Sequence, residues 1–187
     1  MHYEDLLAAV QQQPEGADYH ALRMAYICSP QYAPYIQASD ALEALRAALH
    51  TGDWHAALDA IDQLLDHNYL DIEAHMAADY VFLRLDQEKD ALYHRTFASG
   101  LLDAILATGN GRSPETAWIV IAVQEEYTVL RVLGLTPSGQ RLIQHDGQFL
   151  DVLDAEHNTS GQMLQLYFNV DLPRDWLGRQ MDAADDA

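Results

Sequence analysis

The spacing of apolar residues changes along this chain, and the change falls at the polar, glycine-rich segment Thr108–Ser113. Between Leu42 and Ile105 the apolar residues recur at the spacing of one helix face. After Ser113 they alternate with the period of two that is typical of β-strands. A run of helices followed by a run of strands predicts an α+β fold.

The helical part, residues 1–107, is predicted to form a layer that must pack on something else. Its segment from Gly52 to Asp66 resembles a tetratricopeptide-type helical hairpin, but a single repeat is too few to stand alone. Gly52 is expected to end one helix, and Asp53 to cap the next. Asp71 is expected to cap the helix after that.

Residues 114–172 are predicted to form an antiparallel sheet of about four to five strands. The run Trp118–Val123 is apolar on both faces, which predicts a central strand. A second strand is expected over Tyr127–Leu135, and Asp146-Gly147 predicts a tight hairpin turn. Leu164–Val170 alternates in the manner of a last strand.

The length of 187 residues suits one α+β domain spanning 1–187, with 173–187 as a C-terminal segment that ends in an acidic tail. The net charge is -19, from 29 acidic and 10 basic residues. Such a chain repels phosphate backbones and anionic lipid, so we expect neither nucleic-acid nor membrane binding. A basic protein is the partner that this charge favours.

The expected location is the cytoplasm, because the N-terminus lacks the pattern of a signal peptide and no apolar run approaches transmembrane length. Cys28 is the only cysteine, so no intrachain disulfide is possible. Its apolar neighbours predict a buried free thiol.

Three side chains are candidates for chemistry: His75, His94 and Glu126. Asp79 lies one turn after His75 on the same helix face and could orient its imidazole. An antiparallel pair of helices would bring His75 and His94 together, and Glu126 could then supply a third zinc ligand or a base. Glu126 follows Glu125 at the predicted end of a strand, where one of the two would face inward.

The alternative for these candidates is structural: hydrogen-bonded core histidines and a glutamate that enters solvent. The chain contains no HExxH or CxxC motif. We therefore expect no metal and no cofactor.

Aromatic and acidic side chains of the helical part are candidates for partner binding: Tyr32, Tyr35, Trp54, Asp66 and Asp71. Tyrosine and tryptophan are energetically favoured in protein interfaces, and acidic groups would meet a basic surface. For the two tyrosines, packing against the protein's own helices or sheet is an equally good interpretation.

The loop Gly109–Ser113 has two interpretations. Its glycine N–H groups and Arg112 could bind a phosphate, or its glycines could serve a turn. The loop follows a helix and precedes a strand, which is the reverse of the order in a P-loop. This order favours the turn.

Several short motifs occur together in a fixed order: Tyr32–Tyr35, Gly100–Ile105, Thr108–Ser113, Glu125–Tyr127 and Leu166–Val170. In this order they resemble the bacterial family catalogued as domain of unknown function 4919, over roughly Tyr19 to Val170. The resemblance implies an α+β protein and supplies no catalytic residues.

Two functions follow from these observations. The first is an acidic protein-binding module, for example an immunity or antitoxin-like protein that covers a basic toxin. The second is a small hydrolase or metal-dependent enzyme that uses His75, His94 and Glu126. The lack of a complete catalytic motif favours the binding function.

Overall fold

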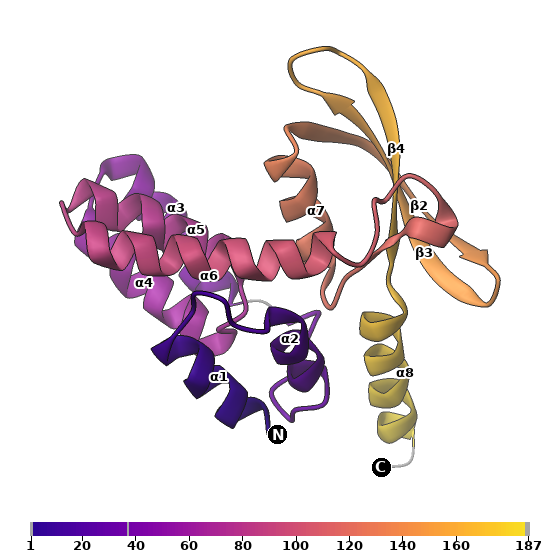
Figure 1. Cartoon of the computed structure of the whole chain (residues 1–187), viewed down its shortest axis with the longest axis horizontal. Helices are drawn as coiled ribbons and strands as arrows, with labels where there is room; N and C mark the ends of the chain where they lie inside the picture. The colour runs from indigo at the N-terminus through magenta and orange to yellow at the C-terminus, as the bar shows by residue number, and fades with distance from the viewer. Residues whose placement is uncertain (1, 37, 186–187) are drawn as a thin grey trace. The chain divides into compact units, whose positions relative to one another are not determined.

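The computed structural model describes residues 2–36 and 38–185, which fall into two compact units (Figure 1). The first unit, Met1–Gln31 with Ile36–Leu102, is helical. The second, Tyr32–Tyr35 with Asp103–Ala187, contains the sheet. A helical part followed by a sheet confirms the predicted α+β class.

The described residues of the first unit form the helices α1 (Tyr3–Gln12), α2 (Tyr19–Ile27), α3 (Ser39–Thr51), α4 (Trp54–His67), α5 (Ile72–Arg84) and α6 (Glu88–Leu106). The last turn of α6 belongs to the second unit. Helix α4 packs between α3 and α5. Gly52 ends α3 with a φ of 72°, and the Asp53 carboxylate begins α4 by accepting from Ala56 N at 3.1 Å. Asp71 begins α5 in the same way, at 3.0 Å from Ala74 N. The three predicted helix ends are confirmed.

The core of α3, α4 and α5 is formed by buried alanines and branched apolar residues: Ala41, Leu45, Ala48, Ala57, Ala60, Ile61, Leu64, Leu65, Ala74, Ala78 and Val81. Alanines at the contacts let the helix backbones approach closely, while the leucines fill the space between them. This packing holds α3, α4 and α5 together as one layer.

The second unit contains a four-stranded sheet in the order β1-β4-β3-β2. Its strands are β1 (Trp118–Ile119), β2 (Leu135–His145), β3 (Gln148–His157) and β4 (Met163–Asn169). Strands β2, β3 and β4 form the predicted antiparallel meander, but β1 runs parallel to β4. The sheet is therefore mixed and not purely antiparallel.

The predicted central strand over 118–123 is wrong, as is the strand over 127–135. The first is reduced to β1, a two-residue strand at the sheet edge, and the second is replaced by helix α7 (Val123–Val132). Glu125, in the first turn of α7, accepts a hydrogen bond from Ile121 N at 2.8 Å. This bond satisfies a backbone donor at the helix start, which β-propensity alone does not anticipate.

The hairpin prediction is confirmed, because Asp146 and Gly147 have φ angles of 48° and 85° between β2 and β3. Figure 1 shows the last helix, α8 (Asp171–Asp185), continuing from the end of β4. It occupies the predicted C-terminal segment, and residues 186–187 of the acidic tail lie outside the described residues. Within residues 2–36 and 38–185, no helix has both the length and the apolar character that crossing a bilayer requires.

Candidate functional site

The two histidines predicted to approach each other are hydrogen-bonded. The Nδ1 atoms of His75, on α5, and His94, on α6, lie 2.9 Å apart, and His75 Nε2 lies 2.9 Å from the carbonyl oxygen of Tyr69. A carbonyl only accepts, so His75 Nε2 carries the hydrogen and His75 Nδ1 accepts. His94 Nδ1 must then donate, which leaves the lone pair on His94 Nε2. We call these two residues the histidine pair.

The histidine pair is held in its uncharged form. His75 is fully buried and stacks on Phe97 at 4.4 Å between ring centroids, and burial lowers the pKa of His75 to about 3. His94 is half-buried against Phe82, and burial also lowers its pKa. Nearby carboxylates oppose this shift at His94: Asp62, Asp90 and Asp79. At neutral pH His94 Nε2 is therefore an acceptor without a hydrogen-bond partner among the described residues, and acidic groups lie around it.

Asp79 does not orient His75, contrary to the prediction. Its carboxylate pairs with Arg95, with Oδ2 3.0 Å from Nε and Oδ1 2.9 Å from Nη2. The orienting group is the Tyr69 carbonyl, and the Tyr69 hydroxyl lies 2.8 Å from that of Tyr93. Every residue has a backbone carbonyl, so the sequence gives no sign that the carbonyl of Tyr69 orients His75.

Glu126, the third predicted member of the site, belongs to the second unit. It lies in the first turn of α7 and not at a strand end. Both glutamates of this turn are buried, but only Glu125 has a structural role, as acceptor from Ile121 N. Glu126 is fully buried, and neither carboxyl oxygen has a hydrogen-bond partner among the described residues.

The surroundings of Glu126 make it a neutral acid. Burial raises the pKa of Glu126 to about 9, and the charges of Asp151 and Glu125 add to the shift. Asp151, on β3, accepts from Gln140 Nε2 at 2.8 Å, and burial raises its pKa as well. A protonated carboxyl beside a second carboxyl is a proton donor at neutral pH.

Two further side chains complete this cluster. Arg174, on α8, places its guanidinium over the Phe149 ring at 3.9 Å, and its buried Nε has no hydrogen-bond partner among the described residues. The pKa of Tyr35 is raised by burial, with Arg174, Asp151 and Glu126 also acting on it. We call Glu126, Asp151, Gln140, Arg174 and Tyr35 the Glu126 cluster. Its members come from five separate segments: α7, β2, β3, α8, and residues 32–35.

The structure thus brings two of the three predicted residues together, and it places the third in a separate acidic cluster. Across residues 2–36 and 38–185, no group of three or more His, Cys, Asp or Glu side chains is placed to hold one metal ion. The members of the Glu126 cluster other than Glu126 were not predicted as chemical candidates. They are scattered in sequence, so only the fold reveals them.

The predicted partner-binding residues have different environments. Tyr32 is buried, and its hydroxyl donates to Ile121 O at 2.7 Å, whereas Tyr35 is 40% exposed. Trp54 is half-buried and makes an edge-on contact with Tyr80, with ring centroids 6.0 Å apart. Asp66 is exposed on α4.

Asp71, the fifth predicted partner-binding residue, caps α5.

Cys28 is exposed, so the prediction of a buried thiol is wrong. It follows directly after α2, whose buried residues are Tyr19, Leu22, Arg23 and Tyr26. It stands two positions after the last of these, and a helix turns well away from its buried face over two residues. Its thiol is therefore left in solvent.

The glycine-rich loop is a turn. The N–H groups of Asn110 and Gly111 both donate to Thr116 O, at 3.0 and 2.8 Å, and Arg112 N donates to the Asn110 side chain at 3.0 Å. A Cβ at Gly111 would lie 2.4 Å from the Trp118 ring. Three of the loop's backbone donors are therefore occupied by neighbouring residues, and Gly111 allows close packing against Trp118.

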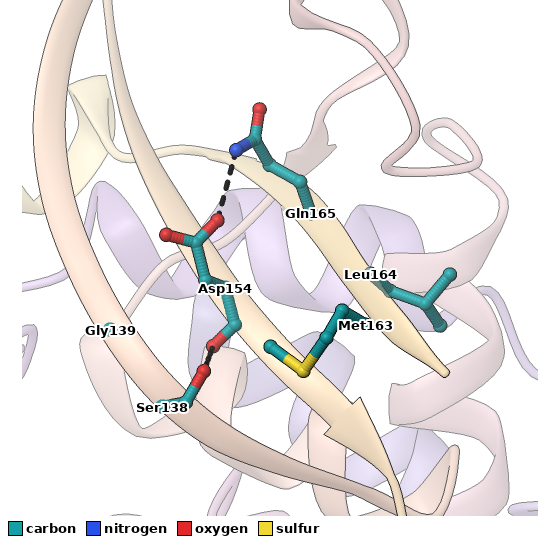
Figure 2. A pocket seen from close by; sticks show the side chains of 6 residues that line it. All are labelled: Ser138, Gly139, Asp154, Met163, Leu164 and Gln165. Atoms are coloured by element: carbon teal, nitrogen blue, oxygen red, sulfur yellow. Dashed lines mark hydrogen bonds between the residues drawn. The ribbon is translucent and has the colours of Figure 1, made fainter. Parts of the chain in front are cut away.

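A shallow depression of about 450 Å³ lies on the sheet beside Ser138, Asp154 and Met163 (Figure 2). Asp154 accepts from Gln165 Nε2 at 2.9 Å and from Arg141 Nη1 at 2.8 Å. The Gln165 bond and then the Arg141 charge lower the pKa of this exposed carboxyl. Its oxygens are already engaged, in contrast to those of Glu126.

The comparisons with known proteins bear on the family of the chain. Neither curated proteins nor solved structures gave a match. The family described as Domain of unknown function (DUF4919) matches residues 1–178, which is nearly the whole length. Because the match covers nearly the whole length, the chain belongs to this DUF4919 family.

Proposed function

We propose that this chain is an acidic, cytoplasmic protein-binding module that neutralises a basic partner, in the manner of an immunity or antitoxin protein. The observation that carries the proposal is an exposed apolar patch on the same helices as an exposed row of carboxylates. The patch, which we call the aromatic patch, comprises Trp54, Tyr80 and Leu83.

The aromatic patch has the features of an interface anchor. Tyr80 is 45% exposed and Leu83 44% exposed, and they are neighbours on α5 because they are three residues apart. Trp54, at the start of α4, supports the Tyr80 ring from the side. Large aromatic side chains held in place by their neighbours lose little entropy on binding.

Helix α4 supplies the charge for the same partner. Its exposed carboxylates Asp59, Asp62 and Asp66 recur at helical spacing, and the helix contains no lysine or arginine to neutralise them. We call these three the acidic stripe. Complementary charge raises the association rate of a basic partner and repels acidic competitors.

Binding to a basic amphipathic helix tests the proposal. A synthetic leucine–lysine helical peptide should bind in fluorescence anisotropy, and a leucine–glutamate peptide should not. Replacing the acidic stripe with asparagines should weaken binding about tenfold and flatten its salt dependence, because three surface charge pairs are lost. Tyr80→Ala should weaken it by about tenfold through loss of the apolar anchor.

The matched control removes the same charge elsewhere. Glu156→Gln, Asp175→Asn and Asp182→Asn change three exposed carboxylates of the second unit and leave the acidic stripe intact. Equal weakening by the two triple variants would show that net charge alone attracts the peptide. That result would contradict a defined binding surface on α4 and α5.

A second function, a small hydrolase, is favoured by the histidine pair. In these tautomers His94 Nε2 carries no hydrogen and keeps its lone pair. The hydrogen bond between His94 Nδ1 and His75 Nδ1 fixes the orientation of the His94 ring. With p-nitrophenyl acetate as the probe, turnover above that of free imidazole is expected, and His94→Gln should lower it at least about tenfold. Turnover that is unchanged in His94→Gln would exclude this function for the histidine pair.

A further inference from the structure

The sheet of the second unit ends in a long, open strand. Strand β2 pairs with β3 on one side and is last in the sheet order. Every residue from Thr136 to Leu142 is exposed. Among the described residues, no hydrogen bond joins the outer backbone edge of β2 between Gln140 and Gln144 to another segment. An edge of this kind is a template for pairing with a further strand.

The hairpin fixes which backbone groups face outward. The two-residue turn at Asp146-Gly147 is closed by the pair His145 and Gln148, which exchange hydrogen bonds across β2 and β3. Successive residues of an antiparallel strand direct their backbone groups to alternate sides. The N–H and C=O groups of Gln140, Leu142 and Gln144 therefore point away from β3.

This edge lacks the charges that normally prevent pairing. Strand β2 contains no lysine and no acidic residue, in a chain that carries 29 of the latter. Its one arginine, Arg141, is bound to Asp154 at 2.8 Å. The irregularity between Pro137 and Gly139 protects the start of the strand only. At its centre Leu142 is 48% exposed.

We propose that the occupant of this edge is the β2 strand of a second copy of the chain. The outward positions read Gln140, Leu142, Gln144, which is the same in both directions. An antiparallel pair centred on Leu142 therefore sets each glutamine opposite a glutamine and Leu142 opposite itself. Self-complementarity of this kind is what a two-fold interface requires. The pairing forms about six hydrogen bonds and one continuous sheet across two protomers.

The charge of the chain gives this interface a distinctive salt dependence. Two protomers of net charge -19 repel each other, and β2 contributes no acidic side chain to that repulsion. Added salt screens the repulsion, so it should strengthen the dimer. A basic partner on the acidic stripe would respond in the opposite sense. Failure of one proposal is thus distinguishable from failure of the other.

Sedimentation equilibrium over a concentration series tests the dimer directly. We expect the full chain to reach twice its monomer mass of 21.0 kDa, at lower protein concentration in about 0.5 M than in about 0.05 M NaCl. Leu142→Lys should raise the dissociation constant at least about tenfold, because like charges then face each other at the two-fold axis. Gln144→Pro should do the same by removing an outward N–H donor while sparing the bonds to β3.

The matched control is Leu92→Lys, which adds the same charge at an exposed leucine of the helical unit. It lowers the overall repulsion as much as Leu142→Lys does, so it should leave the dimer intact or strengthen it. Circular dichroism of each variant should match the unmodified chain. A monomer at both salt concentrations, or a dimer that persists in folded Leu142→Lys, would overturn the proposal.

Discussion

Replacing Glu126 with glutamine is expected to raise the free energy of unfolding of the second unit by about 3 kcal/mol at pH 7. In the folded chain the pKa of Glu126 is raised from 4.5 to about 9 by burial, then by Asp151 and Glu125. Between these values the folded state holds a proton that the unfolded state has lost. Stability therefore falls as pH rises through this window, and glutamine, which has no proton to lose, removes the effect.

Fluorine-labelled tryptophan makes the measurement specific to one unit. Trp118 and Trp176 lie in the second unit and Trp54 in the first, so their fluorine signals report the two units separately in urea titrations. The unmodified second unit should lose stability from pH 5 to pH 9, and Glu126→Gln should have a much shallower profile over that range, in which the raised pKa of Asp151 leaves a small residual slope.

Glu125→Gln is the matched control, because it changes the neighbouring buried carboxyl, which accepts from Ile121 N. A glutamine oxygen can still accept that bond, so the pH dependence set by Glu126 should persist in this variant. A level profile in the unmodified chain would contradict the neutral state of Glu126. Equal flattening by both substitutions would contradict its assignment to Glu126 alone.

The parts of the fold that were predicted correctly depend on local chemistry. Gly52, with its left-handed backbone, and Asp53, with its capping carboxylate, act within one helix turn of themselves. The same holds for Asp146-Gly147, whose turn type is set by two residues. Such signals are visible in sequence because they need no distant partner.

Helix α7 shows where local chemistry is insufficient. Its residues Thr128, Val129 and Val132 have β-branched side chains that favour strands, and the strand prediction followed this preference. The helix forms because Val129 and Leu130 are buried on one face and Glu125 satisfies a donor at its start. The consecutive acids Glu125 and Glu126 are a sequence signal for the start of a helix, because acidic residues are favoured in the first helical turn.

The candidate site divides in a similar way. The meeting of His75 and His94 was predictable because they lie on consecutive helices, and an antiparallel pair of such helices brings their facing residues together. The neighbours of Glu126 were not predictable, because Asp151, Arg174 and Tyr35 lie far from it and from one another in the sequence. Long-range pairing is set by the whole topology, and no spacing rule encodes it.

The helical unit should respond to pH in the opposite sense to the sheet unit, through His75. The pKa of His75 is lowered from 6.5 to about 3 by burial, with the Tyr69 hydrogen bond opposing and His94 adding to the shift. Below pH 6.5 His75 takes up a proton in the unfolded state but stays neutral in the folded state. Stability is therefore fully present above pH 6.5 and should fall by about 3 kcal/mol by pH 4.5.

The Trp54 fluorine signal should record this loss, and His75→Gln should reduce it, because glutamine does not titrate yet can donate to Tyr69 O. Exposed His55 on α4 provides the control, since His55→Gln should leave the acid response unchanged. In proton NMR the His75 ring should remain neutral down to the pH at which the unit unfolds. A His75 ring that titrates near pH 6.5 in the folded chain would show that His75 is not held by its hydrogen bonds to Tyr69 and His94. His94 Nε2 would then lose the fixed lone pair on which the hydrolase function depends.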